Sequence, residues 1–427
     1  MISRKLPETV ILLCLLAIAF ICGYLAHPYI NSAQGAGPEV VVLTPVPTPI
    51  QPLIQSDLAV YWEVTRILEK DFYGLKPTDR ERIYASIRGL VESFEDPYTT
   101  FVEPQPRQRE LDMLRGRFGG IGSYLEHSDL GFFLRPMRDQ PAQIAGLQHC
   151  DLLLEVDEER LEPDMTAEDI SNQIRGLVGE EVTLTIRRVQ NMEQNYNNVE
   201  LCASDDIRQN LTIDLTFVVK RAEIEVPSVE WHVLKQAELP EDVAKDVKIG
   251  YIRHRLFSER STTEMTTALG EMIQDGADRF IWDLRGNPGG IVNIAVELVD
   301  IWLDGGVVMK EDNARGEARE LTANPGGIGM DYPLIILVDG ASASASEIVA
   351  SALQDHERAV VVGEPTFGKG SVQLIHELSD GSSLHVTNAQ WLTPNGNQIS
   401  QQKLQPDVSI EPGVNPLPEA IRIVVNN

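Results

Sequence analysis

The sequence predicts an α/β protein of more than one domain, in which a strand-rich segment lies between an N-terminal helical segment and the α/β core. The chain has 427 residues, which is long for one ordinary domain, and its 43% hydrophobic content is normal for folded protein. Beyond Arg221, apolar strand patterns alternate with amphipathic helix patterns, as in an α/β core. From about Arg115, glycine turns and short strand patterns precede this core.

The net charge excludes some classes of partner. At −28 the chain has no excess of Lys and Arg with which to neutralise phosphates. We therefore expect no nucleic-acid partner and no binding to anionic lipid through a basic surface.

The N-terminal region predicts a membrane segment. Arg4 and Lys5 precede 17 uncharged residues, 10–26, which as a helix would span about 25 Å, near the short limit for crossing a bilayer. We expect residues 1–9 in the cytoplasm, a single-pass anchor over 10–26 and the rest of the chain on the extracytoplasmic side. The alternative is a signal peptide followed by secretion, because residues 33–35 offer small residues at a cleavage spacing.

The next segments are predicted from composition and periodicity. Residues 27–55 form a Pro-rich linker, and residues 56–114 carry two amphipathic helix patterns that end at the Asp-Pro turn of FEDPYTTF. Residues 191–220 are polar and are predicted to be a hairpin or insertion, and the core spans 221–427. An exported pair such as Cys150 and Cys202 can be oxidised, but the sequence does not give their distance, so a disulfide stays open.

Residues 115–190 resemble a PDZ domain of the circularly ordered bacterial kind. The residues that carry the resemblance are Gly119, Gly120, Ile121, Gly122, Pro141, Ala142, Ala145, Gly146, Leu147 and Asp151. The resemblance implies that the loop 119–122 turns backbone N–H groups toward the terminal carboxylate of a peptide, which adds as a strand. Cys150 stands where such domains usually have Gly, which puts the turn before Asp151 in question.

The stretch ASASASEIV places three serines between a predicted buried strand, LIILVD, and a predicted helix. Ser344 and Glu347 fit a capping box, with Ser344 as the N-cap. A nucleophile at a strand-to-helix turn would occupy the same position, because the helix N-terminus offers N–H groups to a developing oxyanion. The local pattern alone does not decide between these two interpretations.

A candidate base lies in GEPTFGKGSVQ. Gly363, Gly368 and Lys369 match a phosphate loop, but Gly370 replaces the required Ser or Thr and a strand pattern follows instead of a helix. We therefore exclude nucleotide binding and interpret the segment as the entry to a strand. A lysine there, if half-buried, could have its pKa lowered from roughly 10.4 by about two to three units and act as a base.

Four motifs taken together are more specific than any one of them. They are DLRGNPGG (283–290), ASASASEIVASALQD (341–355), VVGEPTFGKGSVQ (361–373) and LTPNGNQI with LQPD (392–407). In this order they resemble the C-terminal processing peptidases, or tail-specific proteases, and the resemblance covers nearly all of the chain after residue 56. It implies a crotonase-like (ClpP-like) α/β protease core with an inserted PDZ domain, no metal or cofactor, and protein substrates held by their C-terminal tails.

The resemblance also implies the roles of individual residues. The nucleophile would be Ser344, which precedes Ala-Ser-Glu and lies 25 positions before Lys369. Lys369 would be the base and Gln373 would complete a Ser-Lys-Gln triad. The oxyanion donors would be Ala345 and a glycine of the DLRGNPGG turn, and the choice between Gly289 and Gly290 stays open. Ser342 and Ser346 would be turn and capping residues, and Asp355 a structural one. The competing hypothesis is a catalytically inert PDZ adaptor.

Overall fold

The computed structural model describes residues 58–162, 164–189, 212–244, 246–313, 316 and 318–426. The predicted anchor over 10–26 and the linker over 27–55 lie outside the described residues. Where the structure is described, no helix is both long and apolar enough to cross a membrane. The chain divides into two compact units, Met1–Asp79 and Arg80–Asn427.

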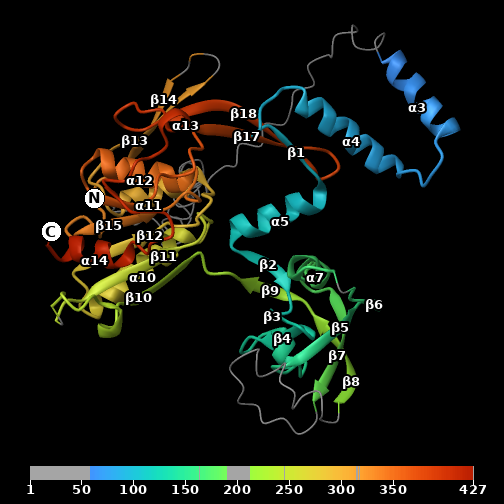
Figure 1. The fold of residues 1–427 in the computed structure, drawn as a ribbon, viewed down its shortest axis with the longest axis horizontal. Helices are drawn as coiled ribbons and strands as arrows, with labels where there is room; N and C mark the ends of the chain where they lie inside the picture. The colour runs from blue at the N-terminus through green and yellow to red at the C-terminus, as the bar shows by residue number, and fades with distance from the viewer. Residues whose placement is uncertain are drawn as a thin grey trace, which may run out of the picture. The chain divides into compact units, whose positions relative to one another are not determined.

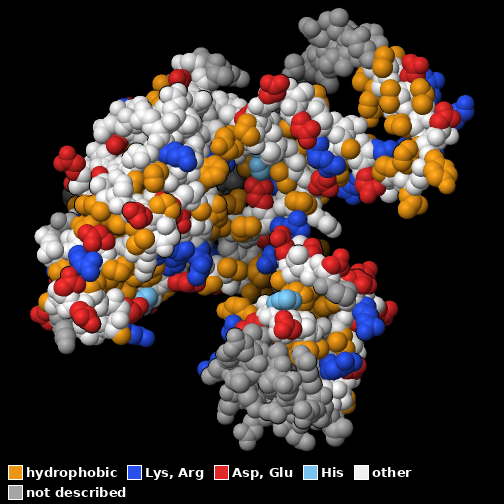
Figure 2. Space-filling view, viewed as in Figure 1, with side chains coloured by type: hydrophobic (Ala, Val, Ile, Leu, Met, Phe, Trp, Pro, Cys, Tyr) orange, Lys and Arg blue, Asp and Glu red, His pale blue; other side chains and the backbone are white. Residues whose placement is uncertain are grey.

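The described part of the first unit contains helix α3 (Ala59–Asp71). No residue of α3 is buried, and large hydrophobic side chains such as Trp62 and Ile67 are exposed along it. Figure 2 shows these hydrophobic side chains gathered on the helix surface. The predicted amphipathic pattern therefore forms a helix.

The centre of the second unit is a six-stranded sheet in the order β10-β11-β12-β15-β16-β19 (Figure 1). The strands are β10 (Val229–Val233), β11 (Ile249–His254), β12 (Arg279–Asp283), β15 (Leu334–Val338), β16 (Val360–Gly363) and β19 (Val408–Ser409). All neighbouring pairs are parallel except β10 with β11. Every residue of β15 is buried, because a parallel sheet covered on both faces needs continuous apolar strands.

Helices cover both faces of this sheet. Phe280 and Trp282 of β12 face a core built with α10 (Ser261–Gln274), α11 (Val292–Asp300) and α12 (Ala345–Asp355). Ile281, between them, faces a second core closed by α14 (Leu417–Asn426). The alternation follows from the period of two in a strand.

A second sheet of the same unit has the order β1-β18-β13-β14, with β17 also paired to β18. Its strands are β1 (Thr100–Val102), β13 (Gly306–Asn313), β14 (Ala318–Ala323), β17 (Ser371–Glu377) and β18 (Ser383–Leu392). Strand β1 comes from the end of the FEDPYTTF motif, which the sequence predicted only as the end of a helical segment. This motif is therefore tied by backbone pairing to the sheet that also carries β17.

The glycine-rich region forms a separate sheet in the order β3-β4-β5-β7-β8, with β6 paired to β5. Its elements are β3 (Ser123–Ser128), β4 (Gly131–Pro136), α6 (Pro141–Ile144), β5 (Asp151–Val156), β6 (Glu159–Arg160), α7 (Ala167–Ile174), β7 (Glu181–Val189) and β8 (Thr212–Lys220). Strands β2 (Arg117–Gly120) and β9 (Ala222–Glu225) pair with each other where the chain enters and leaves this region. The remaining elements are α4 (Asp79–Glu92), α5 (Pro104–Arg115), the 3₁₀ turn η1 (Gln236–Glu238) and α13 (Ile399–Gln402).

Cys150 resolves the question about the turn before Asp151. It has φ +70°, the left-handed conformation that glycine adopts most easily, so the turn is kept although a cysteine occupies the position. Cys150 is disulfide-bonded, and Cys202 lies outside the described residues. Asp151 is buried and accepts two hydrogen bonds from the guanidinium of Arg188, at 2.7 and 2.6 Å.

Candidate active site

Ser344 lies between the end of β15 and the first residue of α12, where it is the N-cap of the helix. Its backbone N–H donates to Oε2 of Glu347 at 2.9 Å, as the predicted capping box requires. Its backbone has φ +54° and ψ −114°, which is unusual for a residue with a side chain and costs on the order of 1–3 kcal/mol. The surrounding structure therefore holds Ser344 in a conformation that it would not choose alone.

Ser342 lies in the predicted turn, where its N–H donates to the carbonyl of Asp339 and its hydroxyl accepts the N–H of Asp339, both at 3.0 Å, and both flanking serines also bind the glycine turn. The hydroxyl of Ser342 donates to the carbonyl of Leu284 at 2.8 Å, and the hydroxyl of Ser346 donates to the carbonyl of Asn287 at 3.0 Å. Both serines are fully buried. They fasten the serine segment to the DLRGNPGG turn, which is more than fifty residues away in the chain.

The glycines of that turn lie against the nucleophile candidate. A Cβ on Gly289 would be 2.8 Å from the Cβ of Ser344 and 2.9 Å from the nitrogen of Ala345, so only glycine fits. The N–H of Gly289 donates to Oδ1 of Asn287 at 2.9 Å. The N–H groups of Ala345 and Gly290 have no hydrogen-bond partner among the described residues. Within the described chain these two donors are therefore unpaired, although Ala345 is fully buried.

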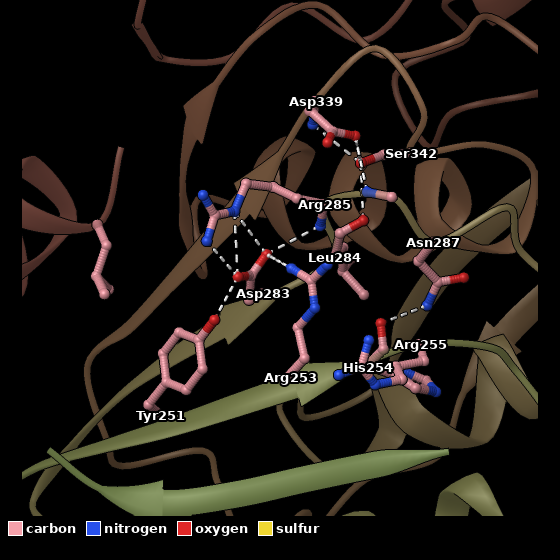
Figure 3. A network of polar contacts seen from close by, with 12 residues as sticks. Tyr251, Arg253, His254, Arg255, Asp283, Leu284, Arg285, Asn287, Asp339 and Ser342 are labelled. Carbon is pink, nitrogen blue, oxygen red and sulfur yellow. Dashed lines mark hydrogen bonds and ion pairs between the residues drawn. The ribbon is translucent and has the colours of Figure 1, made fainter. Parts of the chain in front are cut away.

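A buried charge network holds the base of this turn (Figure 3). Asp283 is fully buried and accepts hydrogen bonds from the guanidinium of Arg285 and the hydroxyl of Tyr251, and Arg253 lies 2.7 Å away. Burial alone would raise the pKa of Asp283, but Arg285 and the other donors hold it below its ordinary value. Burial raises the pKa of Tyr251 to about 12. The N–H of Gly286 donates to Asp339 at 2.9 Å, which links this network to the serine segment.

Lys369 lies just before β17 and is half-buried. Its Nζ donates to Oε1 of Gln373 at 3.1 Å, and the described contacts include no hydrogen bond from Nζ to Ser344. Burial lowers the pKa of Lys369, while the carboxylates of Glu110 and Glu347 act in the opposite direction. The predicted side-by-side placement of Lys369 and Gln373 occurs although a bulge interrupts the pairing of β17 before Gln373.

Glu347 connects the two halves of the candidate site. Its Oε2 accepts the N–H groups of Ser344 and Lys369, both at 2.9 Å. The two backbone nitrogens therefore lie within about 6 Å of each other. Its Oε1 accepts the hydroxyl of Thr366 at 2.5 Å and the N–H of Gly368 at 2.7 Å. One buried carboxylate thus joins the serine segment to the FGKG loop.

Tyr98 also belongs to this site, although the sequence did not predict it. The side-chain amide of Gln373 donates to the backbone carbonyl of Tyr98, and Nζ of Lys369 lies 5.5 Å from the centroid of the Tyr98 ring. The available signal was the FEDPYTTF motif, which the resemblance includes but to which no role was assigned. Asp355 accepts the hydroxyl of Thr393 at 2.5 Å and the N–H of Asn395 at 2.8 Å, so it makes a structural connection.

The GEPTFGKG segment does not have the context of a phosphate loop. It joins β16 to β17, so a strand follows it where a phosphate loop requires a helix. The described residues contain no group of three or more His, Cys, Asp or Glu side chains that could hold a metal ion.

The predicted peptide-binding loop lies in the glycine-rich region. Gly119 and Gly120 belong to β2 and face β9, and the carbonyl of Gly119 accepts the N–H of Gly176 at 3.1 Å. By contrast, the N–H groups of Ile121 and Gly122 are buried without a hydrogen-bond partner among the described residues. Of the four predicted residues, these two therefore have free donors.

Comparison with known proteins agrees with the motifs. Residues 248–410 match the model of peptidase family S41. The chain is 32% identical over 349 residues to the "Carboxyl-terminal-processing protease" of a Synechocystis species, covering 81% of this chain and 75% of that protein. It is 31% identical over 360 residues to the "Probable CtpA-like serine protease" of Staphylococcus aureus (strain COL), covering 84% of this chain.

The chain spans 65% of the length of the staphylococcal relative. Among solved structures, a photosystem II D1 C-terminal processing protease is 26% identical, with a TM-score of 0.46, covering 86% of this chain and 91% of that one. The family model and the relatives identify the chain as a peptidase. The chain belongs to peptidase family S41, among the carboxyl-terminal-processing proteases.

Proposed function

We propose that this protein is a serine endopeptidase in which Ser344 is the nucleophile and Lys369 the general base. The observation that carries the proposal is the carboxylate of Glu347, which binds the backbone N–H of both residues on one oxygen atom. Gln373 would hold the lysine amine through its hydrogen bond to Nζ. A lysine whose pKa is lowered by burial can accept a proton from a neighbouring hydroxyl.

The proposed reaction proceeds through an acyl-enzyme. The oxygen of Ser344 attacks the carbonyl carbon of the scissile peptide, and its proton passes to the neutral amine of Lys369. The free N–H groups of Ala345 and Gly290 would stabilise the oxyanion of the tetrahedral intermediate. Lys369 then gives the proton to the leaving amine, and water hydrolyses the ester. The described hydrogen bond of Gly289 to Asn287 favours Gly290 as the donor within the turn.

We further propose that the body containing β3 to β8 is a PDZ domain that recognises protein C-terminal tails. The free N–H groups of Ile121 and Gly122 would bind the terminal carboxylate, and the tail would add as a strand to β3. Strand β3 suits this role because β4 is its sole neighbour among the described strands. The N-terminal apolar segment would keep the protease on the extracytoplasmic side of the membrane, unless it is cleaved as a signal peptide.

Proteolysis by the purified full chain tests the proposal. The wild type should degrade casein and a reporter protein with an unstructured apolar tail, and Ser344→Ala should degrade neither. Equal degradation by the two proteins would refute the assignment of Ser344, whereas no degradation by either, with tail binding retained, would favour the inert adaptor.

Lys369→Arg is the matching test of the base. Arginine remains charged in proteins, so this variant should fold and yet lose activity by at least about a hundredfold, the size typical of a missing general base. Retained activity would show that another group takes the proton.

A further inference from the structure

The surroundings of the Lys369 amine leave one side chain without a role in the proposed mechanism. Nζ of Lys369 lies over the ring of Tyr98, 5.5 Å from the ring centroid. The backbone carbonyl of Tyr98 accepts a hydrogen bond from the side-chain amide of Gln373. Tyr98 is half-buried and comes from a segment that precedes Lys369 by more than 250 residues. It therefore contacts both the proposed base and the residue that orients it.

The position of Tyr98 is fixed by its own segment. Asp96 accepts the N–H of Tyr98 at 3.3 Å and the hydroxyl of Thr99 at 2.5 Å. The hydroxyl of Thr99 in turn accepts the N–H of Thr387 at 3.1 Å, and β1 pairs with β18 directly after the turn. Because β18 also pairs with β17, Tyr98 and Gln373 are mounted on the same sheet.

The carboxylates near Lys369 favour the protonated form of its amine. Glu110 of α5 and Glu347 of α12 favour the ammonium form, and burial is the cause that lowers its pKa. His385 of β18 also interacts with Lys369, and its own pKa is lowered chiefly by burial. Arg107 of α5 lies 3.0 Å from the carboxylate of Glu110. Any loss of burial at the amine would therefore leave the two carboxylates to dominate and would protonate the base.

We propose that Tyr98 is a positioning residue for the proposed reaction, whose ring excludes water from the Lys369 amine and whose carbonyl orients Gln373. This inference rests on the role of Lys369 proposed above. The ring has two opposite effects, since its π face attracts a cation while its bulk removes solvent. Removing the bulk should have the larger effect, because solvent then reaches an amine that faces two carboxylates.

The test compares three variants of the full chain: Tyr98→Ala, Tyr98→Leu and Tyr98→Phe. For each, kcat/KM is measured against pH, and the pKa of Lys369 is measured in a Ser344→Ala background from the pH dependence of its acetylation, detected by mass spectrometry. The exposed Lys403 is the internal control for the labelling.

We expect the acid limb of the Tyr98→Ala profile to move upward by roughly one pH unit, with about tenfold lower kcat/KM below the lysine pKa. Tyr98→Phe keeps the ring and should match the wild type. Tyr98→Leu keeps apolar bulk without the π face, so its lysine pKa should equal or fall below that of the wild type.

An unchanged or lowered lysine pKa in Tyr98→Ala would overturn the inference, as would a lysine pKa in Tyr98→Leu as high as in Tyr98→Ala. A shift in Tyr98→Phe would also contradict it, since the effect would then belong to the hydroxyl. The acetylation measurement gives the pKa of the Lys369 amine whether or not Lys369 is the base. It therefore tests the role of Tyr98 separately from the proposed function, which would fail if Lys369→Arg retained proteolysis.

Discussion

Four hydrogen bonds converge on the carboxylate of Glu347, although its side chain is fully buried. One donor is Ser344, two are Gly368 and Lys369 of the FGKG loop, and the fourth is Thr366 just before that loop. A buried donor that loses its acceptor costs roughly 1–3 kcal/mol, so the two segments are held at one fixed separation. The sequence predicted Glu347 only as a capping residue of its own helix.

Glu347→Gln tests this role at almost constant volume. An amide offers one acceptor oxygen and places an NH₂ group against two of the donors, so the serine and lysine segments should separate. We expect kcat to fall by about 10–100-fold and the free energy of unfolding to fall by about 1–3 kcal/mol. Steady-state proteolysis and urea unfolding measure the two effects.

The control variant is Thr366→Val, which removes a single donor to Glu347 and leaves the contacts of Ser344 and Lys369 in place. Its kcat should stay within a few-fold of the wild type. If Glu347→Gln is as active as Thr366→Val, the carboxylate does not set the geometry of the site.

Ser344, Lys369 and Gln373 were predicted from motifs in which the residues are near one another in the chain or at a fixed spacing, and their catalytic roles remain a proposal. Tyr98 was not predicted, because the contact between Tyr98 and Gln373 depends on the pairing of β1 and β17 with β18. A local pattern shows that Asp96 and Pro97 form a turn, but it does not show what the turn faces.

At the scale of elements, replacing a glycine by alanine has opposite effects in a tight turn and in a helix. Gly289 has φ +103°, and a Cβ there would collide with the serine segment. Gly289→Ala should therefore reduce proteolysis by at least about tenfold, because the turn must move away from Ser344. The loss is measured as kcat/KM on a tailed reporter.

Gly270 in α10 is the matched control, since nothing lies within 4 Å of a Cβ at this position. Gly270→Ala should stabilise the chain by about 0.5–1 kcal/mol through helix propensity and should leave activity unchanged. Equal activity losses in both variants would argue against a special role for the Gly289 turn.

The elements of the core were predictable where burial dictates an apolar run, as in β15. Strand β8 was harder to place, because residues 191–220 were predicted as a polar hairpin or insertion, whereas 212–220 pair with β7 along their whole length. Six of the nine β8 residues are exposed, but Ile213, Leu215, Phe217 and Val219 alternate with mostly polar residues, so a strand pattern is present within a segment that is polar as a whole.

At the scale of the whole molecule, buried histidine makes stability depend on pH. His254 is fully buried between Phe257 and Trp282, and burial lowers its pKa to about 3. In the unfolded chain this histidine binds a proton below about pH 6.5, whereas in the folded chain its lowered pKa disfavours protonation. Stability is therefore complete above pH 6.5 and falls on acidification toward pH 3.

We expect His254 alone to remove about 2 kcal/mol of unfolding free energy between pH 7.5 and pH 5, and the lowered pKa of His385 acts in the same direction. His254→Gln should reduce this loss, as measured by urea unfolding with tryptophan fluorescence at the two pH values. His376→Gln, at an exposed position, should leave the loss unchanged. An identical loss in all three proteins would exclude His254 as its source.

The pairing of β2 with β9 has a consequence for how this architecture can be altered. Because the two ends of the body containing β3 to β8 lie side by side, the chain could close across them with a two-residue Asn-Gly reverse turn between Gly120 and Ala222. The shortened protein would keep the peptidase core uninterrupted. The same junction would also accept a different binding domain, which under the proposed function would change substrate specificity without altering the proposed catalytic residues.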